Sequence, residues 1–94
     1  MKVYILKSTM YTKNNSHFTN FEEVYSSRKN ATQSMENLIQ EVSKDKEDLV
    51  VEEWTPYHDD VLSQIQLLDQ RTNTYVYSMS IISYEVKTKV SRFV

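Results

Sequence analysis

The residues of this chain best suited to metal binding or proton transfer are His58, Asp59 and Asp60, which follow Glu52 and Glu53 by a few positions. Imidazole and carboxylate groups bind divalent cations, and histidine exchanges protons near neutral pH. Adjacent residues in an extended turn point in different directions, however, and no second histidine lies at a helical interval to complete a ligand set. The sequence therefore favours a solvated turn, and we expect no metal and no cofactor.

The composition does not favour nucleophilic catalysis. The chain has no cysteine and no glycine in 94 residues. Most phosphate-binding loops and nucleophile elbows need glycine, because their backbone adopts φ > 0 or approaches a ligand without a Cβ. The serines lie in no motif that places a base beside them, and His17 lies in a polar segment typical of an exposed loop. We expect a protein that is not an enzyme.

Nucleic-acid binding is the alternative function that the C-terminal segment suggests. Basic side chains would contact phosphates, and tyrosine rings on the sheet would stack on bases. A basic final strand also discourages edge-to-edge aggregation, which is the purely structural interpretation. The residues concerned are Lys87, Lys89 and Arg92, with Tyr75, Tyr77 and Tyr84 as the stacking rings.

Protein binding is the function that the aromatic content favours. Seven tyrosines, four methionines and one tryptophan exceed what a small two-layer core buries. A single helix covers one face of a sheet, so the other face must be polar, paired or bound. Aromatic residues dominate binding hot spots, and the candidate contact residues are Glu52, Glu53, Trp54, Tyr57, Tyr75 and Tyr77.

Charge is distributed unevenly along the chain, whose net charge is −2. The stretch from Glu36 to Asp60 holds nine acidic residues against two lysines, Lys44 and Lys46. Such segregation can steer a basic partner toward one surface. An exposed helix followed by a solvated turn would produce the same imbalance, so both interpretations stay open.

The first half of the chain predicts two strands and a helix. Residues 2–7 are β-prone and apolar on both faces, as in an interior strand, and a second strand is expected over 18–25. The polar segment 13–17 between them predicts a loop in which Asn14 and Asn15 adopt left-handed conformations. Ser26 or Ser27 caps a helix over 27–44, and its apolar stripe consists of Ala31, Met35, Leu38, Ile39 and Val42.

The second half predicts three more strands. A strand over 49–54 is closed by Pro56. Residues 61–68 fit either a strand or a helix, and we favour the strand because a polar turn follows and the β-prone run 75–82 needs a neighbour. If 59–70 were a helix instead, it would cover the second sheet face.

Alternation along the last predicted strand divides its side chains between two faces. Odd positions would share one face, and the apolar positions change to even numbers toward Tyr84, which predicts a bulge or bend near residues 81–83. Both faces of this strand would then be too apolar for open water. The odd positions are Tyr75, Tyr77, Met79 and Ile81, and Val76 and Ile82 lie opposite.

These elements predict one α+β domain over 1–94 with the order β-β-α-β-β-β. The sheet would be mainly antiparallel with four or five strands, and one long amphipathic helix would pack on one face. The absence of cysteine and of any apolar run long enough to cross a membrane predicts a cytoplasmic protein without membrane attachment.

The N-terminal half resembles many small uncharacterised bacterial and phage α+β proteins that open with a Lys-Val-Tyr strand. The residues that carry this resemblance are Lys2-Val-Tyr-Ile-Leu, Glu23-Val-Tyr-Ser-Ser, Ala31 at the start of the helix, and Val50-Val-Glu-Glu-Trp54. It spans residues 1–54 and implies a fold and an origin, with no activity attached. The scarcity of glycine, alanine and proline, whose codons are GC-rich, agrees with an AT-rich genome.

The sequence as a whole predicts a small non-enzymatic protein-binding module. If a phage or mobile element encodes it, as the composition and the resemblance allow, we expect an inhibitor or modulator of a host protein that acts in the host cytoplasm. Self-association as a homodimer is the other way to cover a free sheet face. A nucleic-acid-binding sheet protein is the alternative from a different class.

Overall fold

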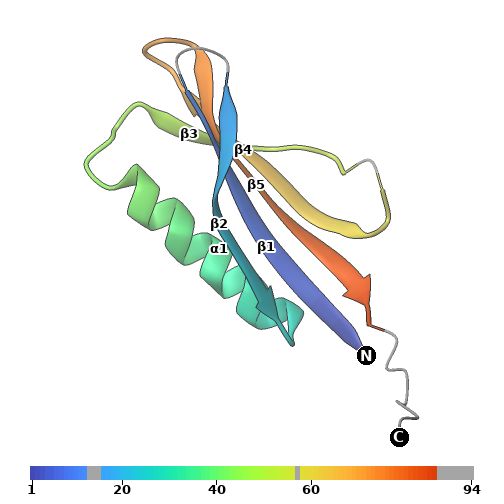
Figure 1. The fold of residues 1–94 in the computed structure, drawn as a ribbon. Coiled ribbons are helices and arrows are strands. Elements are labelled where there is room, and N and C mark those ends of the chain that lie inside the picture. Colours follow the sequence, from blue (N-terminus) through green and yellow to red (C-terminus); the bar gives the residue numbers. More distant parts are fainter. Residues whose placement is uncertain (13–15, 57, 87–94) are drawn as a thin grey trace, which may run out of the picture.

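The computed structural model describes residues 1–12, 16–56 and 58–86. Its elements are β1 (Lys2–Tyr11), β2 (His17–Tyr25), α1 (Arg28–Ser43), β3 (Leu49–Glu53), β4 (Val61–Asp69) and β5 (Thr74–Glu85). The strands form one antiparallel sheet in the order β2-β1-β5-β4-β3, with α1 packed on one face (Figure 1). The α+β class, the element order and the strand over 61–68 are therefore confirmed.

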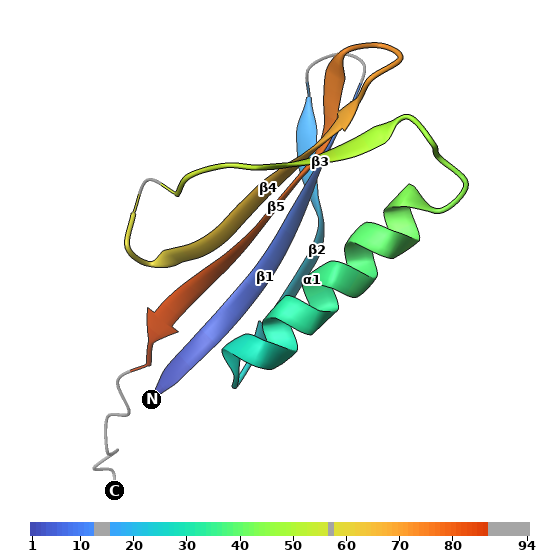
Figure 2. The same cartoon turned by 180° about the vertical axis from the view of Figure 1, so that it is seen from behind.

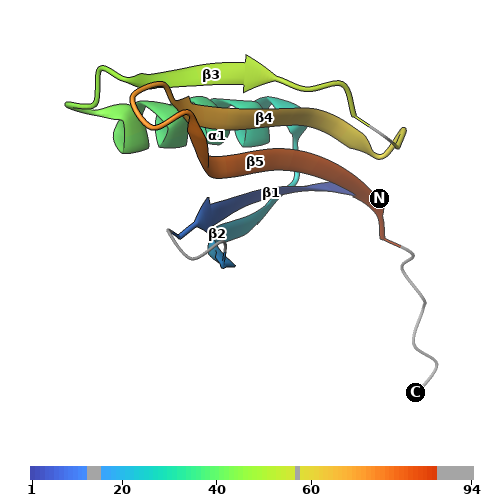
Figure 3. The ribbon, with the colours of Figure 1, turned by 90° about the horizontal axis from the view of Figure 1, so that it is seen from above.

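Strand β1 is an interior strand, as predicted, but it is longer than the apolar run 2–7. It pairs with β2 on one side and β5 on the other, and Figure 3 shows it between these two strands. Because both neighbours continue past residue 7, the ladder carries β1 on to Tyr11. His17 opens β2 instead of lying in the loop, and its ring lies 6.2 Å from that of Tyr11.

Helix α1 forms where the apolar stripe predicts it. The Ser27 hydroxyl accepts a hydrogen bond from the Asn30 N–H at 3.1 Å, which satisfies one of the donors that a helix start leaves unpaired. The stripe faces the sheet and joins its core. Ala31 and Met35 are buried, and Leu38, Ile39 and Val42 pack around them.

Among the described residues, two adopt the left-handed conformation that glycine usually supplies. Asp45 after α1 has φ of 61°, and Asn73 in the β4–β5 turn has φ of 56°. Asp and Asn tolerate this region better than other residues with a Cβ, so a chain without glycine still makes both turns. The predicted left-handed positions Asn14 and Asn15 lie outside the described residues.

The bulge predicted within 81–83 of β5 is wrong. From Tyr77 to Glu85, β5 pairs with β1 without a register shift. The irregularity is in β4 instead, where Val61 opposes Ile82 while Ser63 opposes Ile81. The extra residue therefore lies in β4, between Val61 and Ser63.

A second shift near the start of β5 overturns the predicted division of its faces. Leu67 opposes Tyr77, but the next residue of β4, Leu68, opposes Tyr75, so Val76 is the extra residue of a bulge. Directly opposed residues share a sheet face and successive residues alternate. Tyr75 therefore lies on the face opposite Tyr77, and Val76 packs against the core instead of facing away from it.

Ser8 is an unusual member of the core. It is fully buried in β1, opposite Met79 and Phe21, and its hydroxyl oxygen has no hydrogen-bond partner in the described part of the chain. A buried polar group without a partner costs about 1–3 kcal/mol in lost hydration.

We therefore expect Ser8→Ala to raise the free energy of unfolding by about 1 kcal/mol. Urea denaturation followed by circular dichroism measures it. Ser80→Ala, at a half-buried serine on the other sheet face, should change stability by less than about 0.5 kcal/mol. A loss of stability in Ser8→Ala would show that the hydroxyl is satisfied in solution.

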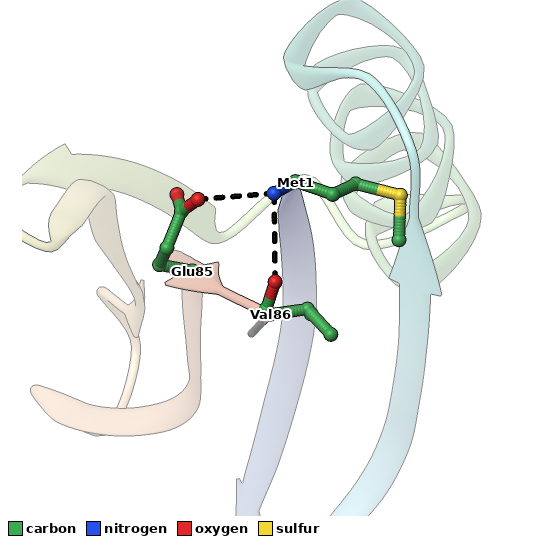
Figure 4. A network of polar contacts seen from close by, with 3 residues as sticks. All are labelled: Met1, Glu85 and Val86. Atoms are coloured by element: carbon green, nitrogen blue, oxygen red, sulfur yellow. Dashed lines mark hydrogen bonds and ion pairs between the residues drawn. The ribbon is translucent and has the colours of Figure 1, made fainter. Parts of the chain in front are cut away.

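The residue before the start of β1, Met1, forms hydrogen bonds with the C-terminal end of β5 (Figure 4). The Met1 ammonium donates to Glu85 Oε1 at 3.0 Å and to the Val86 carbonyl at 3.4 Å, and the Val86 N–H donates to the Met1 carbonyl at 2.7 Å. These contacts extend the ladder by one residue. Because both charges of the ion pair are exposed, the pair adds little stability.

Candidate protein-binding site

The sheet face opposite α1 carries no helix of the described chain (Figure 2). Its middle is polar, because serines of β5 face Lys7 of β1 and Gln64 and Gln66 of β4. Its apolar residues lie toward the two ends of the sheet, with Ile5 beside Ile82 at one end. The expectation that both faces of the last strand are too apolar for open water is therefore wrong for the middle of β5, where Ser78 and Ser80 face outward, and candidate contacts concentrate at the ends.

At the end near the β4–β5 turn, three side chains of this face contact one another. Glu52 Oε1 accepts hydrogen bonds from the Tyr75 hydroxyl at 2.9 Å and from the Trp54 indole N–H at 3.3 Å. The two rings meet edge to face, with centroids 5.7 Å apart and planes at 87°, an arrangement that aromatic pairs favour. We call Glu52, Trp54 and Tyr75 the aromatic–carboxylate cluster.

The backbone explains how three residues from two non-adjacent strands meet. Glu52 opposes Gln66 in the β3–β4 ladder, and the Trp54 N–H donates to the Gln64 carbonyl at 2.9 Å, so the chain stays extended past the end of β3. Residues two apart in an extended segment share a face, which places Trp54 beside Glu52. The bulge at Val76 turns Tyr75 to the same face.

The cluster is exposed although its side chains are held in place. Trp54 is 39% exposed and Tyr75 40%. Each ring is fixed both by a hydrogen bond to the carboxylate and by the contact with the other ring. Large aromatic side chains with one fixed orientation lose little conformational entropy when they bind.

Only half of the predicted contact residues belong to this cluster. Glu53 opposes Ile65 and so lies on the helix-bearing face, where it is exposed. Tyr77 is half-buried and packs against the core. Tyr57 lies outside the described residues. The proposed steering region, from Glu36 to Asp60, runs from the outer side of α1 across β3 to the turn before β4.

A groove of about 940 Å³ opens beside the two rings. Most of its walls come from the segment 69–76, which the sequence predicts as a polar turn and the start of a strand, with no signal that it borders a groove. The remaining walls come from β1, β4 and the segment after β3, which are distant in the chain. The lining residues that sequence reasoning missed include Tyr11, Gln66, Asp69, Arg71 and Thr72.

Two of these residues form hydrogen bonds near the groove, one to a side chain and one to the backbone. Gln66 is buried and its side-chain amide donates to the Ser78 hydroxyl at 3.0 Å. Asp69 Oδ1 accepts from the Arg71 N–H at 3.0 Å, which closes the turn into β5. In the sequence, Gln66 looks like any polar strand residue that faces water, so its burial and its hydrogen bond to Ser78 cannot be predicted.

The carboxylate changes the acidity of the neighbouring phenol. The hydrogen bond to Glu52, together with partial desolvation and the negative charge, raises the pKa of Tyr75 above its ordinary value. The neutral phenol is thus favoured in the folded state. The stability that this contact contributes is complete below the ordinary tyrosine pKa and is lost as pH rises through the raised value.

We expect Glu52→Gln to lower the pKa of Tyr75 toward its ordinary value, because the amide keeps an acceptor but removes the charge. An NMR titration of a ring-labelled tyrosine measures this directly. Glu53→Gln is the matched control and should leave the titration of Tyr75 unchanged. An equal effect of both variants would contradict the contact.

The other candidate sites do not assemble in the described residues. His58 is exposed in the turn before β4, and residues 1–12, 16–56 and 58–86 contain no group of three side chains placed to hold a metal ion. Lys87, Lys89 and Arg92 lie outside the description. Tyr77 faces α1 while Tyr84 opposes Val3 on the open face, so the three tyrosines form no single stacking platform.

Comparison with known proteins gives no match to a family model, to a curated protein or to a solved structure. Within the described ranges, no helix has the length and apolar character needed to span a membrane.

Proposed function

We propose that this protein is a non-enzymatic protein-binding module whose anchor is the aromatic–carboxylate cluster. The observation that supports the proposal is the exposed pair of Trp54 and Tyr75, which both donate a hydrogen bond to Glu52 at the edge of a groove. Tryptophan and tyrosine are the residues most enriched in binding hot spots. Fixing them before binding reduces the entropy lost on association.

The proposed partner is a protein of a bacterial host, and the module would be an inhibitor or modulator encoded by a phage or mobile element and acting in the host cytoplasm. The composition and the resemblance of the N-terminal half support this origin. The acidic stretch around β3 would attract a basic partner surface over a distance of about one Debye length, roughly 8–10 Å in cellular salt.

Site-specific photo-crosslinking tests the proposal. A crosslinking amino acid replaces Thr72, which lines the groove, or Gln40, which is exposed on the outer side of α1. In a lysate of a low-GC bacterium, Thr72 should capture one discrete protein and Gln40 should not. Adding Trp54→Ala should reduce capture at Thr72 about tenfold or more, as expected for loss of a hot-spot residue.

Three outcomes would overturn the proposal. Equal capture at both positions would mean that the contact is not at the cluster. Capture that survives Trp54→Ala would remove the anchor. Capture of a second copy of this chain, with a dimer in native mass spectrometry, would replace the host partner by self-association.

A further inference from the structure

We propose that the groove beside the cluster receives a lysine side chain of the partner, an inference that rests on the protein-binding function proposed above. Three features lead to it: two aromatic rings that border the groove at a right angle, a Glu52 oxygen beside them that accepts no hydrogen bond from the described residues, and an excess of acidic residues in the wall of an adjoining groove.

The rings form a corner suited to a cation. Trp54 and Tyr75 meet edge to face at 87°, and both border the groove. The face of an aromatic ring is negative and attracts ammonium or guanidinium groups, most strongly for tryptophan. No basic side chain of the described residues stacks on either ring, so the exposed ring surface is open to a ligand.

The carboxylate selects between the two cationic side chains. Both hydrogen bonds to Glu52 end on Oε1, and Oε2 accepts none from the residues that the structure describes. Arginine binds carboxylates best through two parallel bonds to both oxygens, whereas lysine is a compact charge that needs only one. With Oε1 already occupied by two donors, the remaining oxygen matches an ammonium group better than a guanidinium group.

The charges around the groove also favour a cation. Asp69 lines it directly, and it also lines a second groove that adjoins the first and has further carboxylates in its wall. Arg71 borders both grooves, and Lys46 borders the second. The acidic residues of the second groove's wall, apart from Asp69, are Asp45, Glu47 and Asp48. The acidic groups thus outnumber the basic ones.

Trp54 makes the test direct, since it is the only tryptophan of the chain and its indole N–H gives a single NMR signal. Pentalysine, pentaarginine and pentaglutamate peptides are titrated separately into the isotope-labelled protein. Pentalysine should shift the indole signal saturably. Pentaarginine should bind more weakly, and pentaglutamate should leave the signal in place.

Two isosteric variants separate a specific site from general attraction. Glu52→Gln should weaken pentalysine binding about fivefold, from loss of the ion pair. Glu53→Gln removes the same charge from the adjacent residue on the other sheet face and should change the affinity by less than about twofold, the range expected for screened surface charges. Equal losses in the two variants, tighter binding of pentaarginine, or shifts confined to residues 45–48 would overturn the lysine site.

Failure of the lysine site is distinguishable from failure of the protein-binding function. If pentalysine does not shift the indole signal but capture at Thr72 still depends on Trp54, the cluster binds a protein through other chemistry. If the capture also fails, the function itself is wrong.

Discussion

Leu67→Ala is expected to lower the free energy of unfolding by about 3 kcal/mol, whereas Leu68→Ala, one residue along β4, should cost about 1 kcal/mol. Leu67 is fully buried between the sheet and α1, and Leu68 is half-buried on the open face. Truncating a buried leucine loses its transfer free energy and leaves a cavity that the core closes only in part. Truncating the half-buried Leu68 loses less transfer free energy and leaves a smaller cavity.

Urea denaturation of the two variants measures the difference. The comparison controls for strand position and residue type, since both leucines belong to β4. It also tests the alternation along β4, which places Leu67 on the helix-bearing face and Leu68 on the open face, opposite Tyr75. Similar costs for the two variants would mean that something covers the open face, such as a second copy of the chain. Native mass spectrometry at the same protein concentration would then show the dimer.

The sequence predicts most of the elements well because they leave a local signal. The capping serine and the stripe that begins with Ala31 define α1, and the β-prone runs define β1 and β5. The run that forms β4 fits a helix as well, and only its place between a turn and the β5 run favours a strand. The extension of β1 to Tyr11 has no such signal, because residues 8–11 are strand only through pairing with β2 and β5. Pairing across the sheet is a tertiary effect that overrides local propensity.

The candidate site was only partly predictable, and one residue explains why. A single extra residue in a strand moves every later side chain to the other face. The bulge at Val76 therefore separates Tyr75 from Tyr77, which simple alternation places together. Glu52 and Trp54 share a face by alternation alone. Their meeting with Tyr75 depends on the bulge, which no turn residue or glycine marks in the sequence.

Ala31 is the site of the second large expected effect. It is the only alanine of the chain and is fully buried in the core where α1 packs on the sheet. A side chain without atoms beyond Cβ at this position allows the helix to approach the strands closely. A larger residue would have to displace the helix or adopt a strained rotamer, which costs about 1–3 kcal/mol in a well-packed core.

We expect Ala31→Leu to lower the free energy of unfolding by about 2–3 kcal/mol, although leucine and alanine are both good helix formers. Gln40→Leu, on the exposed side of α1, is the control and should change stability by less than about 0.5 kcal/mol. If Ala31→Leu does not fold, the milder Ala31→Ser, which buries a hydroxyl, should still fold with a loss of about 1–2 kcal/mol. Wild-type stability in both Ala31 variants would show that α1 is not fixed against the sheet at this point, and the open face would then not be the only one available to a partner.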